Sequence, residues 1–248
     1  GFVEIEDGTI SATQLGSLAS AYYLRLDTAS RFYDLTDADP GDGAILRAVA
    51  RAEEFDSVSA RQAERDAIRN VLGTGTGTLE PGVRKVLAIL QASMDGSVPP
   101  ELRSDAWVIR QNGLRLLAAL GAFFDRYERP AGANRCRRLE ARIETGVPKS
   151  AVGLTALDGV ASGRGHRLSQ TGIESPSEVR RAGVEALVEA GLSEGVSETI
   201  VEQAASMPDV SIDWGEFPEE IAPEATDFCE VTVENDGGGG RVGIRVTV

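Results

Sequence analysis

Lysine is almost absent from the sequence, and several other residue types are scarce. Only Lys85 and Lys149 are lysine, so arginine supplies the remaining basic residues, while 39 acidic residues against 25 basic ones give a net charge of −14. Aromatic residues make up only 5% of the chain. Many short acids with few lysines and aromatics are typical of proteins that stay soluble in concentrated salt. We therefore interpret the net charge as adaptation to a salt-rich, halophilic and archaeal-like cytoplasm.

A second set of absences concerns catalysis. Cys136 and Cys229 are too few and too far apart to indicate a disulfide framework or a zinc site. His166 is the single histidine, and no Ser-His-Asp or Cys-His arrangement is apparent. There is no GxxxxGK[ST] loop, and the glycine-rich stretch at 73–78 lacks the lysine of such a loop and indicates a connector. We therefore predict that this chain has no enzyme activity, no metal and no cofactor.

Long apolar runs are also missing. No stretch of eighteen apolar residues and no signal-peptide pattern is present, so we expect a soluble, cytoplasmic protein with no membrane partner. The length of 248 residues is enough for one to three domains. The first residue is Gly1, and the last, Val248, lies inside an alternating segment. Both ends indicate a piece of a longer polypeptide.

One long helical pattern, residues 103–127, is the central feature of what the sequence contains. At about 100° per residue, one broad face is apolar, with Ile109, Gly113, Leu116, Leu117, Leu120, Phe124 and Tyr127 on it. Trp107 lies on the flank of this face, and we expect it in the core. A narrower stripe carries Gln111, Asn112 and Arg115, together with small residues. Either the stripe of a core helix simply meets water, or the helix lines a channel and these three side chains face a passing polymer.

Around this helix the sequence predicts a mainly α protein. Residues 1–10 indicate a short hairpin, the end of a winged-helix domain, and residues 11–147 indicate a bundle of six or seven helices with the long helix at its centre. We expect Asp27 or Thr28 to cap one of the earlier helices. The acid pair at 53–54 is expected to form a solvated or ion-paired helix end.

Short helices broken by glycine follow in residues 148–206. A Gly-Val turn at 159–160 precedes a predicted helix at 163–170, which is the rhythm of a helix-hairpin-helix module. Such a module holds a phosphate with the backbone N–H groups of a helix start. Arg164 and Arg167 on that helix are therefore candidate nucleic-acid contacts. The alternative is a helical cap that touches no nucleic acid.

Residues 207–248 change to a strand pattern. Segments 228–234 and 241–248 alternate apolar and polar residues around a glycine-rich turn, so they predict a hairpin with one apolar side. A lone hairpin is marginal in water, so it either packs on the helices or belongs to a larger sandwich that continues past Val248. Ten acids and two arginines from residue 207 onward favour a protein-facing or solvated surface over a phosphate contact.

Basic residues gather between positions 125 and 149, where seven bases accompany four acids. Arginine suits phosphate contacts and stacking on bases. We therefore take Arg126, Arg135 and Arg138 as candidate nucleic-acid contacts. The alternative is that these arginines neutralise neighbouring acids on the surface.

Four segments of the chain resemble one known family. They are ATQLGSLASAYYLRLDTASRFYDL, AILRAVARAEEF, SDAWVIRQNGLRLLAAL and CRRLEARIETGV. These look like the C-terminal Sec-sixty-three homology unit of Ski-like superfamily-two helicases. The unit occurs in the spliceosomal RNA helicase and, in shorter form, in archaeal DNA-repair helicases. The similarity covers nearly the whole chain. The parts come in the order expected of the family: the end of a winged helix, a helical bundle, a helix-hairpin-helix, and a small β-sandwich region of fibronectin or immunoglobulin type, here truncated.

The resemblance implies a ratchet helix at 103–127, with Arg115 against single-stranded DNA or RNA as it leaves the motor. It also implies motor domains in the same polypeptide, which would use ATP and Mg²⁺, and a regulatory protein as a further partner. Three positions depart from patterns of the family. Val108 and Arg115 stand where the archaeal repair enzymes have an arginine and a tryptophan, and Ala161 stands where a second hairpin glycine is common.

The sequence therefore predicts the accessory C-terminal region of an ATP-dependent helicase, which guides single-stranded nucleic acid and is not itself an enzyme. A protein–protein interaction scaffold without nucleic-acid contact is the alternative. A structural brace for the motor is a third interpretation.

Overall fold

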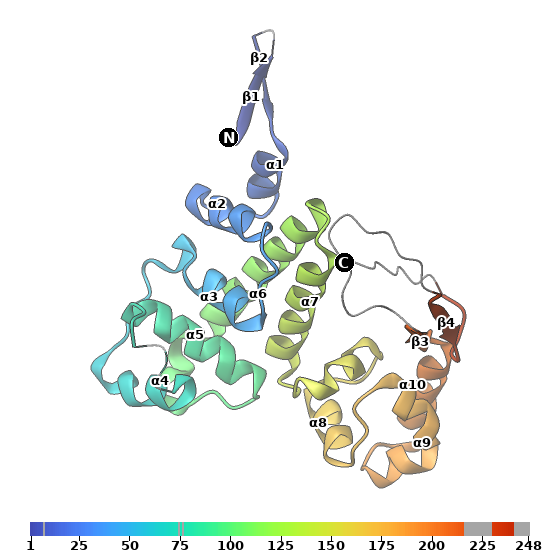
Figure 1. Cartoon of the computed structure of the whole chain (residues 1–248). Coiled ribbons are helices and arrows are strands. Elements are labelled where there is room, and N and C mark those ends of the chain that lie inside the picture. Colours follow the sequence, from blue (N-terminus) through green and yellow to red (C-terminus); the bar gives the residue numbers. More distant parts are fainter. Residues whose placement is uncertain (7, 74, 76, 216–229, 241–248) are drawn as a thin grey trace. The chain divides into compact units, whose positions relative to one another are not determined.

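Helices make up most of the residues that the structure describes, as the sequence predicted (Figure 1). The structure is a computed structural model, and it describes residues 1–6, 8–73, 75, 77–215 and 230–240. The chain divides into two units, Gly1–Val152 and Gly153–Val248. Each unit has its own packed helices and is described separately below.

The first unit begins with the predicted hairpin and continues as a helical bundle. Strands β1 (Val3–Glu6) and β2 (Thr9–Ala12) pair antiparallel, with Val3 opposite Ala12. The helices that follow are α1 (Gln14–Ala21), α2 (Leu26–Leu35), α3 (Asp42–Ala50), α4 (Arg65–Leu72), α5 (Pro81–Met94), α6 (Arg103–Arg126) and α7 (Pro130–Thr145). Short 3₁₀ turns lie between them at η1 (Glu53–Phe55), η2 (Gln62–Glu64) and η4 (Pro100–Leu102).

Helix α6 is the centre of the core. Its buried side chains are at most 2% exposed and include Ile109, Leu116, Leu117, Leu120, Phe123 and Phe124. The ring of Phe123 meets Phe32 of α2 edge to face, with centroids 6.0 Å apart. A Cβ at Gly113 would lie 2.5 Å from Leu90 Cδ2, so this glycine lets α5 and α6 approach closely. The predicted apolar face is confirmed.

The buried face of α6 is wider than the sequence indicated. Ala119, which the pattern placed on the small or polar stripe, is fully buried, and so is Phe123, which the pattern did not assign to the apolar face. In the described part of the chain, α1, α2, α3, α5 and α7 all pack against α6. Because five helices surround α6, they bury residues outside its main apolar face as well.

A buried cation joins α5, η2 and the first turn of α6. Lys85 is 1% exposed, and its ammonium group donates to Glu64 Oε1 at 2.8 Å, to the carbonyl oxygen of Ser59 at 3.2 Å and to Asp105. An ammonium group has three N–H donors, and each has an acceptor here. The hydrogen bond from Lys85, more than any other cause, holds the pKa of Asp105 below its usual value. No pattern in the sequence predicts this cluster.

The start of α2 differs from the prediction. The helix begins at Leu26, and neither Asp27 nor Thr28 caps it. Glu54 of η1 takes this role instead, because its carboxylate accepts from the backbone N–H of Arg25 at 2.9 Å and from the hydroxyl of Thr28 at 2.7 Å. The first N–H groups of a helix lack internal partners, so a carboxylate from another element can satisfy them. The expectation that this acid pair forms a solvated or ion-paired helix end is therefore wrong for Glu54.

The second unit contains short helices joined by tight turns. After η5 (Ser150–Ala156), its helices are α8 (Ser162–Gln170), α9 (Pro176–Glu189) and α10 (Glu194–Ser206). Gly159 before α8 and Gly191 before α10 have φ of 85° and 88°, in the left-handed region that favours glycine. The predicted turn at 159–160 and helix at 163–170 are confirmed.

The described part of the β region contains a strand pair that the sequence did not predict. β4 (Thr232–Asn235) pairs antiparallel with β3 (Val210–Asp213), with Val210 opposite Asn235. The partner that the sequence predicted, residues 241–248, lies outside the described residues, as do residues 216–229. The described residues contain this one strand pair in the second unit, so a fibronectin- or immunoglobulin-like region stays a prediction.

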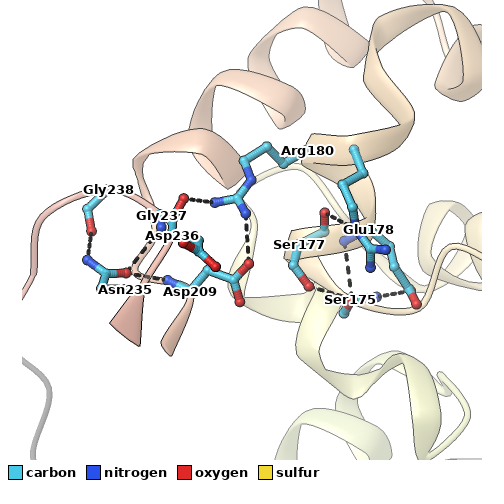
Figure 2. Close-up of polar contacts among 10 residues, drawn as sticks. Ser175, Ser177, Glu178, Arg180, Asp209, Asn235, Asp236, Gly237 and Gly238 are labelled. Carbon is cyan, nitrogen blue, oxygen red and sulfur yellow. Dashed lines mark hydrogen bonds and ion pairs between the residues drawn. The ribbon is translucent and has the colours of Figure 1, made fainter. Parts of the chain in front are cut away.

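Arg180 of α9 fastens this strand pair to the helices, as Figure 2 shows. Its guanidinium donates to Asp209 Oδ2 and to the carbonyl oxygen of Asp236, at 2.8 and 2.9 Å. Asn235 closes the same corner, because its side-chain oxygen accepts from the N–H groups of Asp209 and Gly237. One arginine thereby holds both chain segments at the same end of the strand pair, where β3 begins and β4 ends.

The Lys85 cluster leads to a prediction about stability. We expect Lys85→Met to lower the free energy of unfolding by about 3–5 kcal/mol, because the buried Glu64 carboxylate loses its buried cation and keeps the exposed Arg61 guanidinium at 3.6 Å. Lys149→Met is the matched control, since the other lysine has a 68% exposed side chain and pairs with Asp42 at 2.9 Å. Its loss should stay below about 1 kcal/mol. Urea unfolding at pH 7 measures both, and equal losses would contradict the assignment.

The same cluster predicts a pH dependence. A carboxylate whose folded pKa is lowered stabilises the fold fully above its unfolded pKa of about 3.9. This contribution is lost as the pH falls through the folded pKa. For Asp105 we therefore expect the stability of the wild-type protein to drop steeply below about pH 4, and more gently in the Lys85→Met variant. Urea midpoints at pH 2.5 to 6 test this, and identical slopes would rule it out.

A further prediction concerns Arg180. Arg180→Ala should speed hydrogen exchange of the β3–β4 amides, because the strand pair loses its fastening to α9. Arg181→Ala is the control, since the Arg181 guanidinium reaches only the Ser177 carbonyl of its own helix. Exchange followed by mass spectrometry compares the two variants. Unchanged protection in Arg180→Ala would show that other contacts hold the strands.

Candidate nucleic-acid interface

The exposed side of α6 forms a continuous strip, which we call the α6 seam. It consists of Trp107, Val108, Gln111, Asn112 and Arg115. Trp107 is 70% exposed and Gln111 is exposed, while Asn112 and Arg115 are half-buried. The expectation that Trp107 lies in the core is wrong. Position 107 precedes Gln111 by four residues, so both side chains lie on the same side of the helix.

Two of the three predicted seam residues bind other parts of the protein. Arg115 Nη1 donates to the carbonyl oxygen of Tyr22 at 2.6 Å, which turns the guanidinium toward the end of α1. Asn112 Nδ2 donates to the carbonyl of Val108 in its own helix at 3.2 Å. Among the described residues, Gln111 makes no side-chain hydrogen bond. The seam is open, but Arg115 is anchored in it and does not extend freely into solvent.

Helix α7 and the residues after it bring four bases together, which we call the α7 cluster: Arg135, Arg138, Arg142 and Lys149. With Asp42 and Leu139, they line a cavity of about 130 Å³. Arg138 is exposed and has no ion pair among the described residues. The other three bases are neutralised, as the following contacts show.

Acids from other elements pair with most of the cluster. Arg135 forms an ion pair with Asp39, and Lys149 lies 2.9 Å from Asp42. Arg142 lies 4.0 Å from Asp95 and has a buried Nε atom without a hydrogen-bond partner. The Arg135–Asp39 pair fits the alternative interpretation, in which arginines neutralise neighbouring acids, and a phosphate contact of Arg135 stays a prediction.

Of the remaining bases of positions 125–149, two bind other groups of the protein and one is exposed without an ion pair. Arg137 pairs with Asp125, and Arg129 Nε donates to the carbonyl of Thr36 at 3.0 Å. Arg126 is exposed at the end of α6 and makes no ion pair within the described part of the chain. Arg126 and Arg138 thus carry positive charge that neither an acid nor a carbonyl group of the described residues engages, while Arg129 keeps its charge but is tied to a carbonyl.

The two candidate arginines of the second unit brace its turns. Arg164 Nη1 donates to the carbonyl of Gly159 at 2.5 Å, and Arg167 Nη1 donates to the carbonyl of Gly191 at 2.8 Å. Both interactions stabilise the left-handed glycine turns that precede α8 and α10. The sequence placed these arginines on the correct helix but could not show which carbonyl oxygens they would bind.

A large groove lies away from the α6 seam, in the first unit. It has a volume of about 1070 Å³ and is bordered by the end of α3, η1 and the start of α5. Arg31, Arg51 and Arg65 line it, together with Asp56 and Glu80. Arg51 and Arg65 are exposed and have no ion pair among the described residues. No sequence pattern predicted a role in binding for these positions.

The described residues offer no group of three or more His, Cys, Asp or Glu side chains that could hold a metal ion. Within them, no helix has both the length and the apolar character needed to cross a bilayer. Cys136 is fully buried, and burial raises the pKa of its thiol to about 12. A thiol with so high a pKa stays protonated near neutral pH and is a poor nucleophile.

Comparison with known proteins gives a consistent match. Residues 12–236 match the family model of the Sec63 Brl domain. The chain is 31% identical over 148 residues to "Activating signal cointegrator 1 complex subunit 3" of Gallus gallus. The aligned stretch covers 57% of this chain and 7% of that protein. The protein of the same name from Homo sapiens is 32% identical over 124 residues, covering 47% of this chain and 6% of its own length. The chain thus spans only a small part of these relatives.

The position of Arg115 predicts a structural effect. We expect Arg115→Ala to lower the free energy of unfolding by about 1–3 kcal/mol, because the Tyr22 carbonyl loses a charged donor. Gln111→Ala, on the same seam, should change it by less than about 0.5 kcal/mol. Urea unfolding measures both. If Arg115→Ala were as stable as wild type, the bond to Tyr22 would not hold the seam in place.

Proposed function

The chain belongs to the Sec63 Brl domain family, which confirms the resemblance found in its sequence, and on this premise we propose that it is the accessory C-terminal region of an ATP-dependent helicase. In this proposal it guides single-stranded DNA or RNA along the α6 seam during unwinding. Motor domains of the same polypeptide would bind ATP and Mg²⁺, since the present sequence has no GxxxxGK[ST] loop to cradle nucleotide phosphates.

The observation that carries this proposal is the exposed α6 seam on an otherwise buried helix. One side of α6 is the centre of the core, so the position of the other side is fixed. Trp107 supplies a flat aromatic surface there, and Gln111 supplies a free amide. Base–aromatic stacking contributes about 1–3 kcal/mol per base and tolerates any sequence, as a strand-guiding surface requires.

The charge distribution limits how the strand would bind. Within the described chain, Arg126 and Arg138 are the bases of positions 125–149 that have neither an ion pair nor a side-chain hydrogen bond. With two phosphates neutralised, log K should fall with log[salt] at a slope of roughly −1.4, which is shallow for a nucleic-acid-binding protein. Stacking on the seam, more than phosphate attraction, would then hold the strand.

A second candidate function is a protein-docking scaffold, which the groove of about 1070 Å³ favours. Arg51 and Arg65 offer unpaired positive charge beside the apolar side chains of Phe55, Val58 and Leu79 in this groove. Such a lining suits an acidic segment of a regulatory protein. This candidate requires no nucleic-acid contact, so one set of variants separates the two functions.

Strand binding by the isolated chain tests the proposal. We expect a fluorescent single-stranded oligonucleotide to bind at 50 mM salt, Trp107→Ala to weaken this binding by about fivefold or more, and the double variant Arg126→Ala/Arg138→Ala to flatten the salt slope. Arg51→Ala/Arg65→Ala is the matched control, because it removes two exposed arginines from the groove and should change neither quantity.

Fluorescence anisotropy across a salt titration gives both the affinity and the slope. No binding at 50 mM salt would contradict the proposal. So would an equal loss of affinity in the two double-arginine variants. Capture of an acidic peptide that depends on Arg51 and Arg65 would favour the docking scaffold instead.

A further inference from the structure

Tyr23 has a backbone conformation that aromatic residues rarely adopt. Its φ is 52°, in the left-handed region. Helix α1 ends there in a Schellman motif, in which the N–H of Tyr23 donates to Ser20 O at 3.2 Å and the N–H of Leu24 donates to Ala19 O at 2.8 Å. Glycine usually occupies the left-handed position of this motif, since a side chain is strained there.

Burial of the side chain does not offset this strain. Tyr23 is 86% exposed, whereas the next residue, Leu24, is buried and continues the core. Within the described residues the Tyr23 ring has no stacking or edge contact with another ring. The backbone of this turn thus favours glycine, and the core gains nothing from the ring. Residues held in such conformations cluster at functional sites, where the strain is retained for another reason.

Arg115 connects this turn to the α6 seam. Its Nη1 atom lies 2.6 Å from the carbonyl oxygen of Tyr22 and 3.5 Å from that of Tyr23. The Tyr23 backbone is therefore held beside the seam at the position of Arg115. Trp107 lies eight residues earlier on α6, which is about 12 Å along the helix axis. Trp107 therefore lies at one end of the seam, and the turn that carries Tyr23 lies beside the other end, at Arg115.

We propose that Tyr23 is a base-stacking residue for single-stranded nucleic acid, and that Arg115 is the positioning residue that holds its turn against α6. This inference rests on the proposed function and adds a second contact to it. The Arg115 guanidinium also places positive charge beside the backbone of this turn, where it could attract the phosphate that follows a stacked base.

The chemistry of the seam favours a nucleobase over an apolar protein segment. A stacked base needs a flat exposed ring with charge and amide groups nearby. The seam offers Trp107, Arg115 and Gln111, and the turn bound to Arg115 adds Tyr23. Tyr23 is 86% exposed, so an apolar side chain that docked on its ring would remain largely in solvent. An open ring suits a ligand whose bases move past it.

The test uses three variants of the whole chain. Tyr23→Gly removes the ring and relieves the backbone strain, so its melting temperature should not fall below that of wild type. Its affinity for a fluorescent single-stranded oligonucleotide should drop by about 5- to 100-fold. Tyr23→Phe keeps the ring and should bind within about twofold of wild type.

Glu128→Gly is the matched control for the backbone. Glu128 also has a left-handed φ, 57°, at the end of α6, and the next residue closes the same motif through Arg129 N–H to Phe124 O at 2.7 Å. This variant should keep wild-type affinity for the oligonucleotide. An equal loss in Glu128→Gly and Tyr23→Gly would overturn the inference, because the effect would then follow the backbone and not the ring.

The remaining outcomes separate the inference from the proposed function. Wild-type affinity in Tyr23→Gly together with weakened binding in Trp107→Ala overturns the role of Tyr23 and leaves the proposed function in place. Wild-type affinity in both variants overturns both. A loss in Tyr23→Phe as large as in Tyr23→Gly also overturns the inference, since the hydroxyl and not the ring would be responsible.

Discussion

The three hydrogen bonds of the Lys85 ammonium group constrain the position of α6, and the rest of the first unit depends on that position. They tie the first turn of α6, through Asp105, to Glu64 and to the Ser59 carbonyl. Arginine, which replaces lysine almost everywhere else in this chain, has a larger planar head that does not match three acceptors around one nitrogen. The retained lysine thus reflects geometry. It fixes one end of the helix while the packed face of α6 fixes its rotation.

Periodicity predicted what depends on one helix alone. The apolar face of residues 103–127 and the turn at 159–160 are confirmed, because each is decided by spacing within a short segment. Three features depended on the neighbours of α6: the burial of Ala119, the burial of Phe123 and the exposure of Trp107. The sequence did not indicate the pairing of β3 with β4, while the predicted partner of β4, residues 241–248, lies outside the described residues. Strand pairing between distant segments is set by tertiary packing, which the alternating pattern does not encode.

The candidate site shows the same limit more clearly. The sequence identified arginine-rich segments, but the acids that neutralise them come from distant parts of the chain. Asp39 pairs with Arg135 across almost a hundred residues, and Arg115 binds a carbonyl at a similar separation. In a chain with so many acids, most arginines serve as internal ties. The surface that remains for a ligand is defined by exposed aromatic side chains and a few unpaired charges, so counting bases overestimates a nucleic-acid interface.

The proposed function requires that the open side of α6 contacts single-stranded nucleic acid. Photocrosslinking of an oligonucleotide that carries iodouracil or thiouracil, followed by mapping of the modified peptides, tests this claim directly. Crosslinks to the residue 103–115 segment of α6, with Trp107 as the main site, are the expected result. Crosslinks that avoid α6 and map to the groove beside α3 and α5 would contradict the account.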